Sequence, residues 1–144
     1  MTAYVDTSVL VAALTAEVKT PDVQTWLAAQ SAGELVISDW VSTEFSSALS
    51  LKLRTGQITV KQRADALALF NQFRTESLVL LPVSPLHFRM AAQMADNHAL
   101  GLRAGDALHL AVAADAGATL VTLDQTQAAA GEALGVPTGL PSSP

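Results

Sequence analysis

Four acidic residues lie at the edges of strongly apolar segments of this chain: Asp6, Glu44, Asp106 and Asp124. Burying a lone carboxylate beside apolar surface is costly, and carboxylates gathered within a few ångströms raise each other's pKa. A hard divalent cation removes that cost, and carboxylate and water ligands favour Mg²⁺ or Mn²⁺ over zinc. Such an ion activates a bound water and shields phosphate charge, which is the chemistry of phosphodiester hydrolysis.

The segments that carry these acids alternate between short apolar runs and longer helical patterns. The runs predict strands at 3–5, 35–37, 78–81 and 119–122. Periodicity, turn residues and capping signals predict helices at 7–14, 21–27, 38–54, from 59 onwards, 86–99, 103–116 and 125–134. Residues 135–144 are expected to form a loop-like tail, with one edge strand at Val136.

Strands that alternate with helices imply parallel pairing through crossovers. We therefore expect an α/β fold in three layers (α/β/α), with a short parallel sheet of four to five strands flanked by helices. The predicted strands are apolar throughout, which favours a sheet covered on both faces. The 144 residues fit a single domain, 1–144.

In such sheets the active site lies at the carboxyl ends of the strands. Asp6 and Asp124 come directly after predicted strands, so we expect them to meet there. Glu44 lies in the first half of a predicted helix, and Asp106 lies near the start of another, where the partial positive charge of a helix stabilises a carboxylate. Helix capping is the alternative role for Asp106.

Composition limits the class of protein. Half of the residues are hydrophobic and 15% are charged, against about 25% in a typical soluble domain. Apolar surface for a partner and a larger core explain this equally well. The net charge of −5 counts mildly against nucleic-acid binding. The absence of cysteine excludes thiolate chemistry and fits a cytoplasmic location, and no run reaches the roughly 18 apolar residues of a membrane span.

Other residues carry weaker signals. His109 is one helical turn from Asp106 and could reach the same ion, although a hydrogen-bonded helix histidine is the favoured interpretation. His87 and His98 are expected on one helix, about 16 Å apart along its axis, so they cannot share an ion. Arg103 could approach the acids and temper their charge.

Hydroxyl, basic and aromatic residues leave two interpretations each. Thr7 and Ser8 either cap a helix or order water and phosphate. The basic residues beside one helical hairpin form either a solvated face or a strip that contacts RNA phosphates; they are Lys52, Arg54, Lys61 and Arg63. The tryptophans, Trp26 and Trp40, are core or interface residues more often than base-stacking platforms.

The segments around the four acids resemble a known family. VDTSVL at 5–10, STEF at 42–45, GDALHLA at 105–111 and LVTLD at 120–124 are similar to the four acidic blocks of PIN-domain ribonucleases, in the same order. The likeness is strongest to the VapC-type toxins of bacterial toxin–antitoxin pairs, and it covers nearly the whole chain. The first and third blocks are specific, whereas the second is weak alone.

The resemblance implies a PIN-like fold and a Mg²⁺-dependent endoribonuclease, with Mn²⁺ as the other candidate ion. Asp6 and Asp106 would be the principal metal ligands, and Glu44 and Asp124 would complete a catalytic set of four acids through water or a second ion. A metal-activated water would leave a 5′-phosphate and a 3′-hydroxyl. The expected partners are an RNA substrate, a VapB-type antitoxin that places a basic side chain near the acids, and a second copy of the chain.

Two alternatives belong to other classes. A PIN-like scaffold would bind a partner without cutting it, which the presence of all four acids disfavours. A phosphatase of the haloacid dehalogenase class needs a second acid two residues after its nucleophile, and Ser8 stands there. Dinucleotide binding is disfavoured because no G-x-G-x-x-G follows the first strand.

Overall fold

A parallel sheet of five short strands forms the centre of the computed structural model, which describes residues 2–142. The strands are β1 (Ala3–Val5), β2 (Leu35–Ser38), β3 (Val79–Leu81), β4 (Thr119–Val121) and β5 (Thr138–Gly139). Their order across the sheet is β3-β2-β1-β4-β5, so β1 is the central strand. Tyr4 pairs with Val36 of β2 on one side and with Leu120 of β4 on the other.

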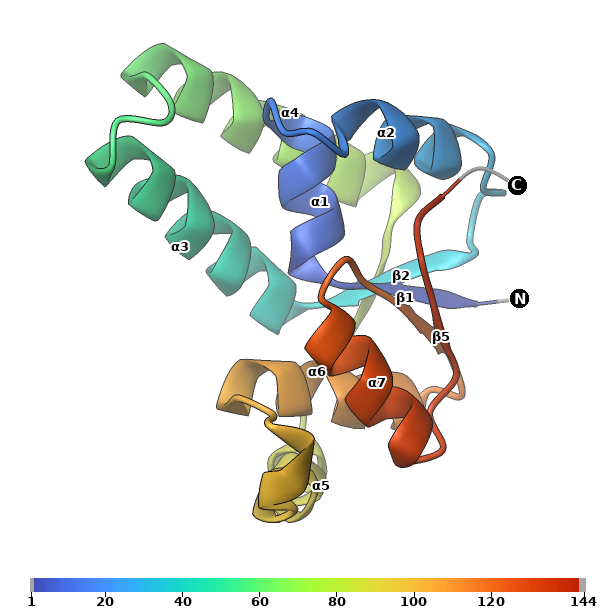
Figure 1. Cartoon of the computed structure of the whole chain (residues 1–144). Helices are drawn as coiled ribbons and strands as arrows, with labels where there is room; N and C mark the ends of the chain where they lie inside the picture. The colour runs from blue at the N-terminus through green and yellow to red at the C-terminus, as the bar shows by residue number, and fades with distance from the viewer. Residues whose placement is uncertain (1, 143–144) are drawn as a thin grey trace.

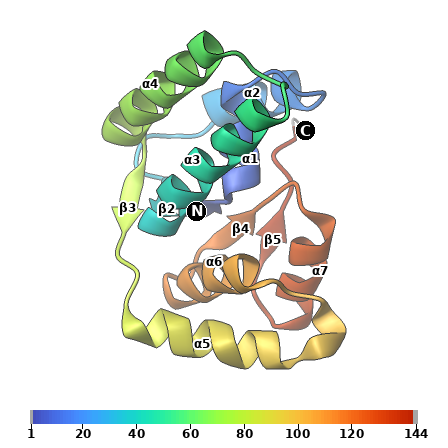
Figure 2. The ribbon, with the colours of Figure 1, turned by 90° about the vertical axis from the view of Figure 1, so that its left-hand side faces the viewer.

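Helices cover both faces of the sheet (Figures 1 and 2). One layer contains α1 (Thr7–Leu14), α2 (Thr20–Ala28), α3 (Asp39–Arg54) and α4 (Val60–Ser77). The other contains α5 (Pro85–Asp96), the 3₁₀ turn η1 (His98–Leu100), α6 (Ala104–Asp115) and α7 (Gln125–Ala133). The expected three-layer α/β/α fold with a short parallel sheet is therefore confirmed. Among the described residues, no helix is long and apolar enough to cross a membrane.

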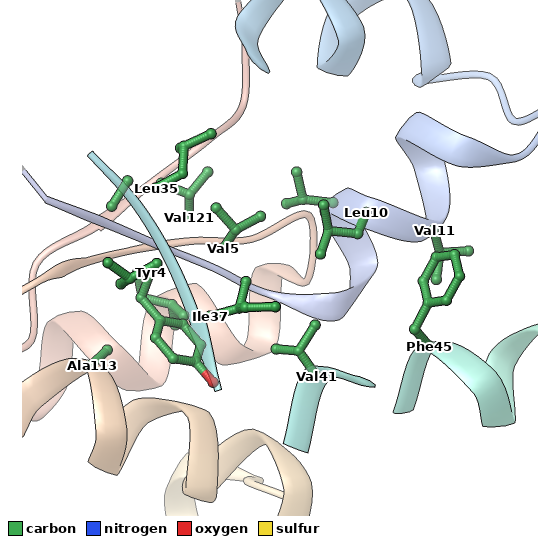
Figure 3. Packing of buried hydrophobic residues seen from close by; sticks show 14 of the residues in the cluster. Tyr4, Val5, Leu10, Val11, Leu35, Ile37, Val41, Phe45, Ala113 and Val121 are labelled. Carbon is green, nitrogen blue, oxygen red and sulfur yellow. The ribbon is translucent and has the colours of Figure 1, made fainter. Parts of the chain in front are cut away.

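The core is built around β1. Tyr4 and Val5 are consecutive residues of β1. Both are fully buried, and their side chains extend to opposite faces of the sheet, as those of successive strand residues do (Figure 3). On the α1–α4 side, the rings of Phe45 and Phe70 stack with centroids 4.4 Å apart and join α3 to α4. This packing fixes the direction in which α3 leaves the sheet, and α3 carries Glu44.

Helix starts follow the local sequence signals with one exception. Thr59 and Gln62 form the predicted capping box at the start of α4. Ser84 precedes Pro85 at the start of α5, as expected. The exception is α1, which is capped by Asp6 and not by Thr7 or Ser8: the Asp6 carboxylate accepts a hydrogen bond from the Ser8 backbone N–H.

The helix predicted over 86–99 is wrong at its C-terminal end. The helix stops at Asp96 because Asn97 leaves the helical region, with ψ 84°. The chain then makes a 3₁₀ turn that ends at Gly101, whose φ of 65° suits glycine. His98 therefore lies in η1, and the expectation that it shares a helix with His87 is wrong.

Two further details differ from expectation. The last strand is at Thr138–Gly139, because Val136 instead turns back to donate its N–H to the Gly131 carbonyl. The sheet is not covered at its β3 edge, where Val79 and Leu80 are 43% and 45% exposed. An edge strand has one neighbour, and the helices that flank the sheet leave its outer side open.

Candidate active site

All four predicted acids line two hollows at the carboxyl edge of the sheet. The first hollow has a volume of about 620 Å³ and extends toward Trp40, Gly101, Gly105 and Thr126. The second has a volume of about 650 Å³ and extends toward α1 and the middle of α3. Both are lined by Glu44, Arg103, Asp106 and Asp124, whereas Asp6 lines only the second. Both volumes are in the range of ordinary ligand pockets.

Asp6 lies at the end of β1 and is 5% exposed. Its Oδ2 accepts hydrogen bonds from the Ser8 backbone N–H at 3.0 Å and from the Thr122 hydroxyl at 3.2 Å. The Thr122 hydroxyl also accepts from the Asp124 backbone N–H at 3.0 Å. Thr122 therefore lies between the two acids that follow the neighbouring strands β1 and β4. Its single hydroxyl proton is shared between Asp6 and Gln127 Oε1, the latter at 2.8 Å, so the Ser8 backbone N–H is the bond that orients the buried carboxylate.

Glu44 projects from α3 toward α1 and α6. Its Oε1 accepts a hydrogen bond of 2.7 Å from the Thr7 hydroxyl and a short one from His109 Nε2. Burial works to raise the pKa of Glu44, but the hydrogen bond and charge of His109, together with Thr7, outweigh it and lower the pKa below its ordinary value. Glu44 is therefore an ionised carboxylate whose second oxygen, Oε2, is left for other partners.

A buried chain of side chains supports His109 from behind. The Tyr4 hydroxyl lies 2.7 Å from both Ser38 Oγ and His109 Nδ1. Burial raises the pKa of Tyr4 well above its ordinary value, despite the hydrogen bond with Ser38, so its hydroxyl keeps its proton. The imidazole is thereby engaged at both nitrogens and fixed between the interior of the sheet and Glu44.

Asp6, Glu44 and His109 offer ligand atoms that lie within 4.8 Å of one another, a spacing that a metal ion could bridge. An ionised carboxylate only accepts hydrogen bonds, so His109 Nε2 must carry the proton that it donates to Glu44. A protonated nitrogen has no lone pair for a metal. The geometry therefore agrees with a hydrogen-bonded helix histidine that orients Glu44, and it leaves the carboxylates as candidate ligands.

Asp106 lies in the first turn of α6 and forms no side-chain cap, since Arg103 occupies the N-cap position. Burial raises the pKa of Asp106 to about 6, and the negative charges of Asp124, Asp6 and Glu44 act in the same direction. These causes show that the four carboxylates act on one another electrostatically. A cluster of this kind, with oxygen donors alone, fits a hard divalent cation.

Asp124 has a structural role as well. It caps α7, and its Oδ1 accepts from the backbone N–H groups of Thr126 and Gln127 at 2.9 and 3.1 Å. It lies outside the 4.8 Å group, as does Asp106. The structure thus brings Asp6 and Glu44 into direct proximity through His109, and it places Asp106 and Asp124 along the same hollows.

Gly105 lets two side chains of α3 approach the backbone of α6. A Cβ at this position would lie 2.8 Å from Glu44 Oε2 and 3.2 Å from Trp40 Nε1, which is closer than normal packing allows. The Trp40 indole packs against the small core between α5 and α6 and also lines the first hollow. Its Nε1 is buried without a hydrogen-bond partner among the described residues. The absence of a side chain at Gly105 therefore helps to set the position of Glu44.

Sequence reasoning missed several residues of this site. Thr122 could have been found, because it lies within the segment that ends at Asp124. No sequence pattern pointed to Tyr4 or Ser38 as residues of the site. Both belong to apolar strands, and the two residues that form this contact are 34 positions apart in the chain. Thr7 was expected to cap a helix or to order water, and it donates to Glu44 instead.

Comparisons with known proteins agree with this architecture. A family model described as PIN domain matches residues 3–133. No curated protein has a significant sequence match to the chain. Among solved structures, the sarcin–ricin-loop-cleaving toxin VapC20 of Mycobacterium tuberculosis is similar with a TM-score of 0.73 and 19% identity, over 90% of this chain and 95% of that one.

Two other solved structures are similar to the chain. FitAcB from Neisseria gonorrhoeae gives a TM-score of 0.71 at 20% identity, over 96% of this chain and 97% of the other. DNA-bound VapBC from Salmonella typhimurium gives 0.72 at 14% identity, over 98% of each chain. At such identities these structures share the fold, while the family model covers most of the sequence. The chain belongs to the PIN-domain family.

Proposed function

We propose that this protein is a Mg²⁺-dependent endoribonuclease and the toxin of a type II toxin–antitoxin pair. The observation that carries the proposal is the gathering of four carboxylates around two joined hollows, where their mutual repulsion helps to raise the pKa of one of them to about 6. Such an arrangement is unfavourable unless a cation neutralises it. Similarity to VapC20, a toxin that cleaves the sarcin–ricin loop, supports RNA as the substrate class.

In this proposal Asp6 and Asp106 would hold the cation, and the chemistry that it would supply there is the activation of a water and the shielding of phosphate charge. Glu44 and Asp124 would complete the acidic set and would orient the attacking water or accept its proton. Thr7 and His109 fix Oε1 of Glu44, which leaves Oε2, beside Gly105 at the first hollow, for this role. Positioning of this kind lowers a barrier because the groups are already oriented before the reaction begins.

The expected protein partners are a VapB-type antitoxin and a second copy of the chain. One similar structure is a toxin–antitoxin complex from Klebsiella pneumoniae, and another is a member of the VapBC family of toxin–antitoxin systems from Mycobacterium tuberculosis, which supports the first. Large exposed apolar side chains are available for such contacts, including Val18 at 95%, Val60 at 73% and Phe88 at 58%. A small reading frame directly beside this one, encoding a DNA-binding protein with a disordered tail, would support the pair.

The direct test is Asp6→Asn. Asparagine keeps the side-chain oxygen that caps α1, so the fold should remain while cation binding and RNA cleavage are lost. Asp39→Asn is the matched control, because Asp39 is an exposed acid in the first turn of α3 that lines neither hollow. Cleavage of RNA in Mg²⁺ by folded Asp6→Asn at the rate of the unmodified protein would refute the proposal.

A test in cells complements the assay. Expression of the chain alone should slow bacterial growth, and the effect should disappear with Asp6→Asn and persist with Asp39→Asn. If the unmodified chain is harmless but cleaves RNA in vitro, the toxin role is wrong and the nuclease role stands.

A further inference from the structure

One cationic side chain lies at the acidic hollows. Arg103 is the only lysine or arginine among the described residues that line them, and it lines both. It is exposed and stands at the N-cap position of α6, three residues before Asp106. Within residues 2–142 its guanidinium forms no ion pair and no hydrogen bond. Its five N–H donors are therefore available to a ligand.

Two of the four basic residues of the predicted strip are already engaged. Lys52 forms an ion pair of 3.1 Å with Glu17, which itself lines the second hollow. Lys61 pairs with Asp65 at 2.8 Å on the outer surface of α4. The predicted RNA-binding strip is therefore partly neutralised within the protein, and a polyanion that enters the hollows meets Arg103 as the free positive side chain there.

Arg103 lies beside the acids without pairing with them. It lines both hollows together with Asp106 and Asp124, yet its guanidinium forms no ion pair with a carboxylate among the described residues. Its charge is therefore available to a ligand.

The position of Arg103 between the two hollows suggests what it contacts. A single RNA strand whose scissile phosphate lies at the acids must pass from one hollow to the other, with a neighbouring nucleotide in each. The first hollow offers the Trp40 indole and the exposed Thr126 side chain, and the second offers Ser47 and Leu51. A guanidinium shared by both hollows is placed to bind the backbone, and its planar fork matches a phosphate bidentately.

We propose that Arg103 binds the RNA phosphate next to the one that is cut, and so positions the strand across the two hollows. The proposal rests on the proposed nuclease function and goes further by naming a substrate-binding residue and the path of the strand. Because Arg103 contacts the backbone, it increases affinity without choosing a base.

The test measures RNA binding with the cleavage-impaired Asp6→Asn protein and a short fluorescein-labelled single-stranded RNA, by fluorescence anisotropy at several salt concentrations. Adding Arg103→Gln should weaken binding by about tenfold or more, as expected for loss of hydrogen bonds to a charged group. The slope of log affinity against log salt should fall by about 0.7, the value for one phosphate contact on a single strand. Arg89→Gln, an exposed arginine on α5 outside both hollows, is the matched control and should change neither.

Cleavage kinetics separate binding from chemistry. In the otherwise unmodified protein, Arg103→Gln should raise KM with kcat largely retained, and Arg103→Lys should restore the salt dependence. Unchanged affinity and salt slope in Arg103→Gln, or a fall in kcat at constant KM, would overturn the proposal. If the unmodified protein binds the RNA but does not cut it, the nuclease function is wrong while phosphate binding by Arg103 stands. If the unmodified protein does not bind RNA, both are wrong.

Discussion

Gly105→Ala tests whether the absence of a side chain at this position of α6 sets the position of Glu44. The new methyl group would lie 2.8 Å from Glu44 Oε2 and 3.2 Å from Trp40 Nε1, so at least one of these side chains must move. Trp40 is held by packing against the core between α5 and α6, whereas Oε2 is the end of a flexible side chain. We therefore expect Glu44 to be displaced from the cation site.

The expected loss of stability is smaller than the loss of function. Overpacking costs about 1–3 kcal/mol, and replacing glycine by alanine within a helix returns up to about 1 kcal/mol. The free energy of unfolding should thus fall by about 2 kcal/mol or less. Displacing a group that holds or orients a metal ligand typically weakens metal affinity or activity by about 10- to 100-fold, and this range is expected here for Mg²⁺ affinity and RNA cleavage.

The measurements are urea unfolding, calorimetric titration with Mg²⁺, and cleavage of a labelled RNA. Gly139→Ala is the matched control, because a Cβ there would make only an ordinary 3.8 Å contact with the Thr119 side chain. Glu44→Gln provides the reference for a lost carboxylate. If folded Gly105→Ala bound Mg²⁺ and cut RNA as the parent does, the proposed dependence of Glu44 on this glycine would be wrong.

Further predictions concern protons, buried hydroxyls and caps. The pKa of Asp106 is raised from 3.8 to about 6, so Mg²⁺ affinity should fall as the pH drops through about 6, and Asp106→Asn should flatten this dependence in titrations on both sides of that pH. In metal-free protein the same raised pKa costs stability as the pH rises from about 4 through about 6, so Asp106→Asn should be more stable than the parent to urea near pH 7 and not at pH below about 4. Tyr4→Phe leaves Ser38 and His109 without their hydroxyl partner and should lower the free energy of unfolding by about 1–3 kcal/mol; an unchanged urea midpoint would contradict this. Thr59→Ala removes a cap of α4 and should cost about 1 kcal/mol while Mg²⁺ affinity stays constant.

The fold and part of the site could be predicted because they follow from local rules. Asp6 and Asp124 could be brought together from the sequence, since the strands that precede them were recognisable and parallel strands end at one edge. In the structure Val5, directly before Asp6, pairs with Val121, which lies shortly before Asp124. The alternation of strands and helices predicted the α/β fold with its parallel sheet, whereas the PIN-like arrangement was expected from the resemblance of the four acidic segments to that family.

The rest depends on contacts that no local pattern contains. His109 receives its orientation from Tyr4, which is 105 positions away, and from Glu44, which is 65 positions away. On α4, Leu69 is 50% exposed although the next residue, Phe70, is buried. Side-chain direction at such positions is decided by how helices meet, and only the assembled structure shows it.

The central place of β1 has a consequence for the synthesis of the chain. Asp6 leaves the ribosome more than a hundred positions before Thr122 and Asp124. Strand β4, which brings these two residues, must pair with β1 before the acids can meet. A nascent chain therefore carries no assembled acidic cluster until nearly all of this domain has emerged, and the proposed nuclease activity can arise only after that point.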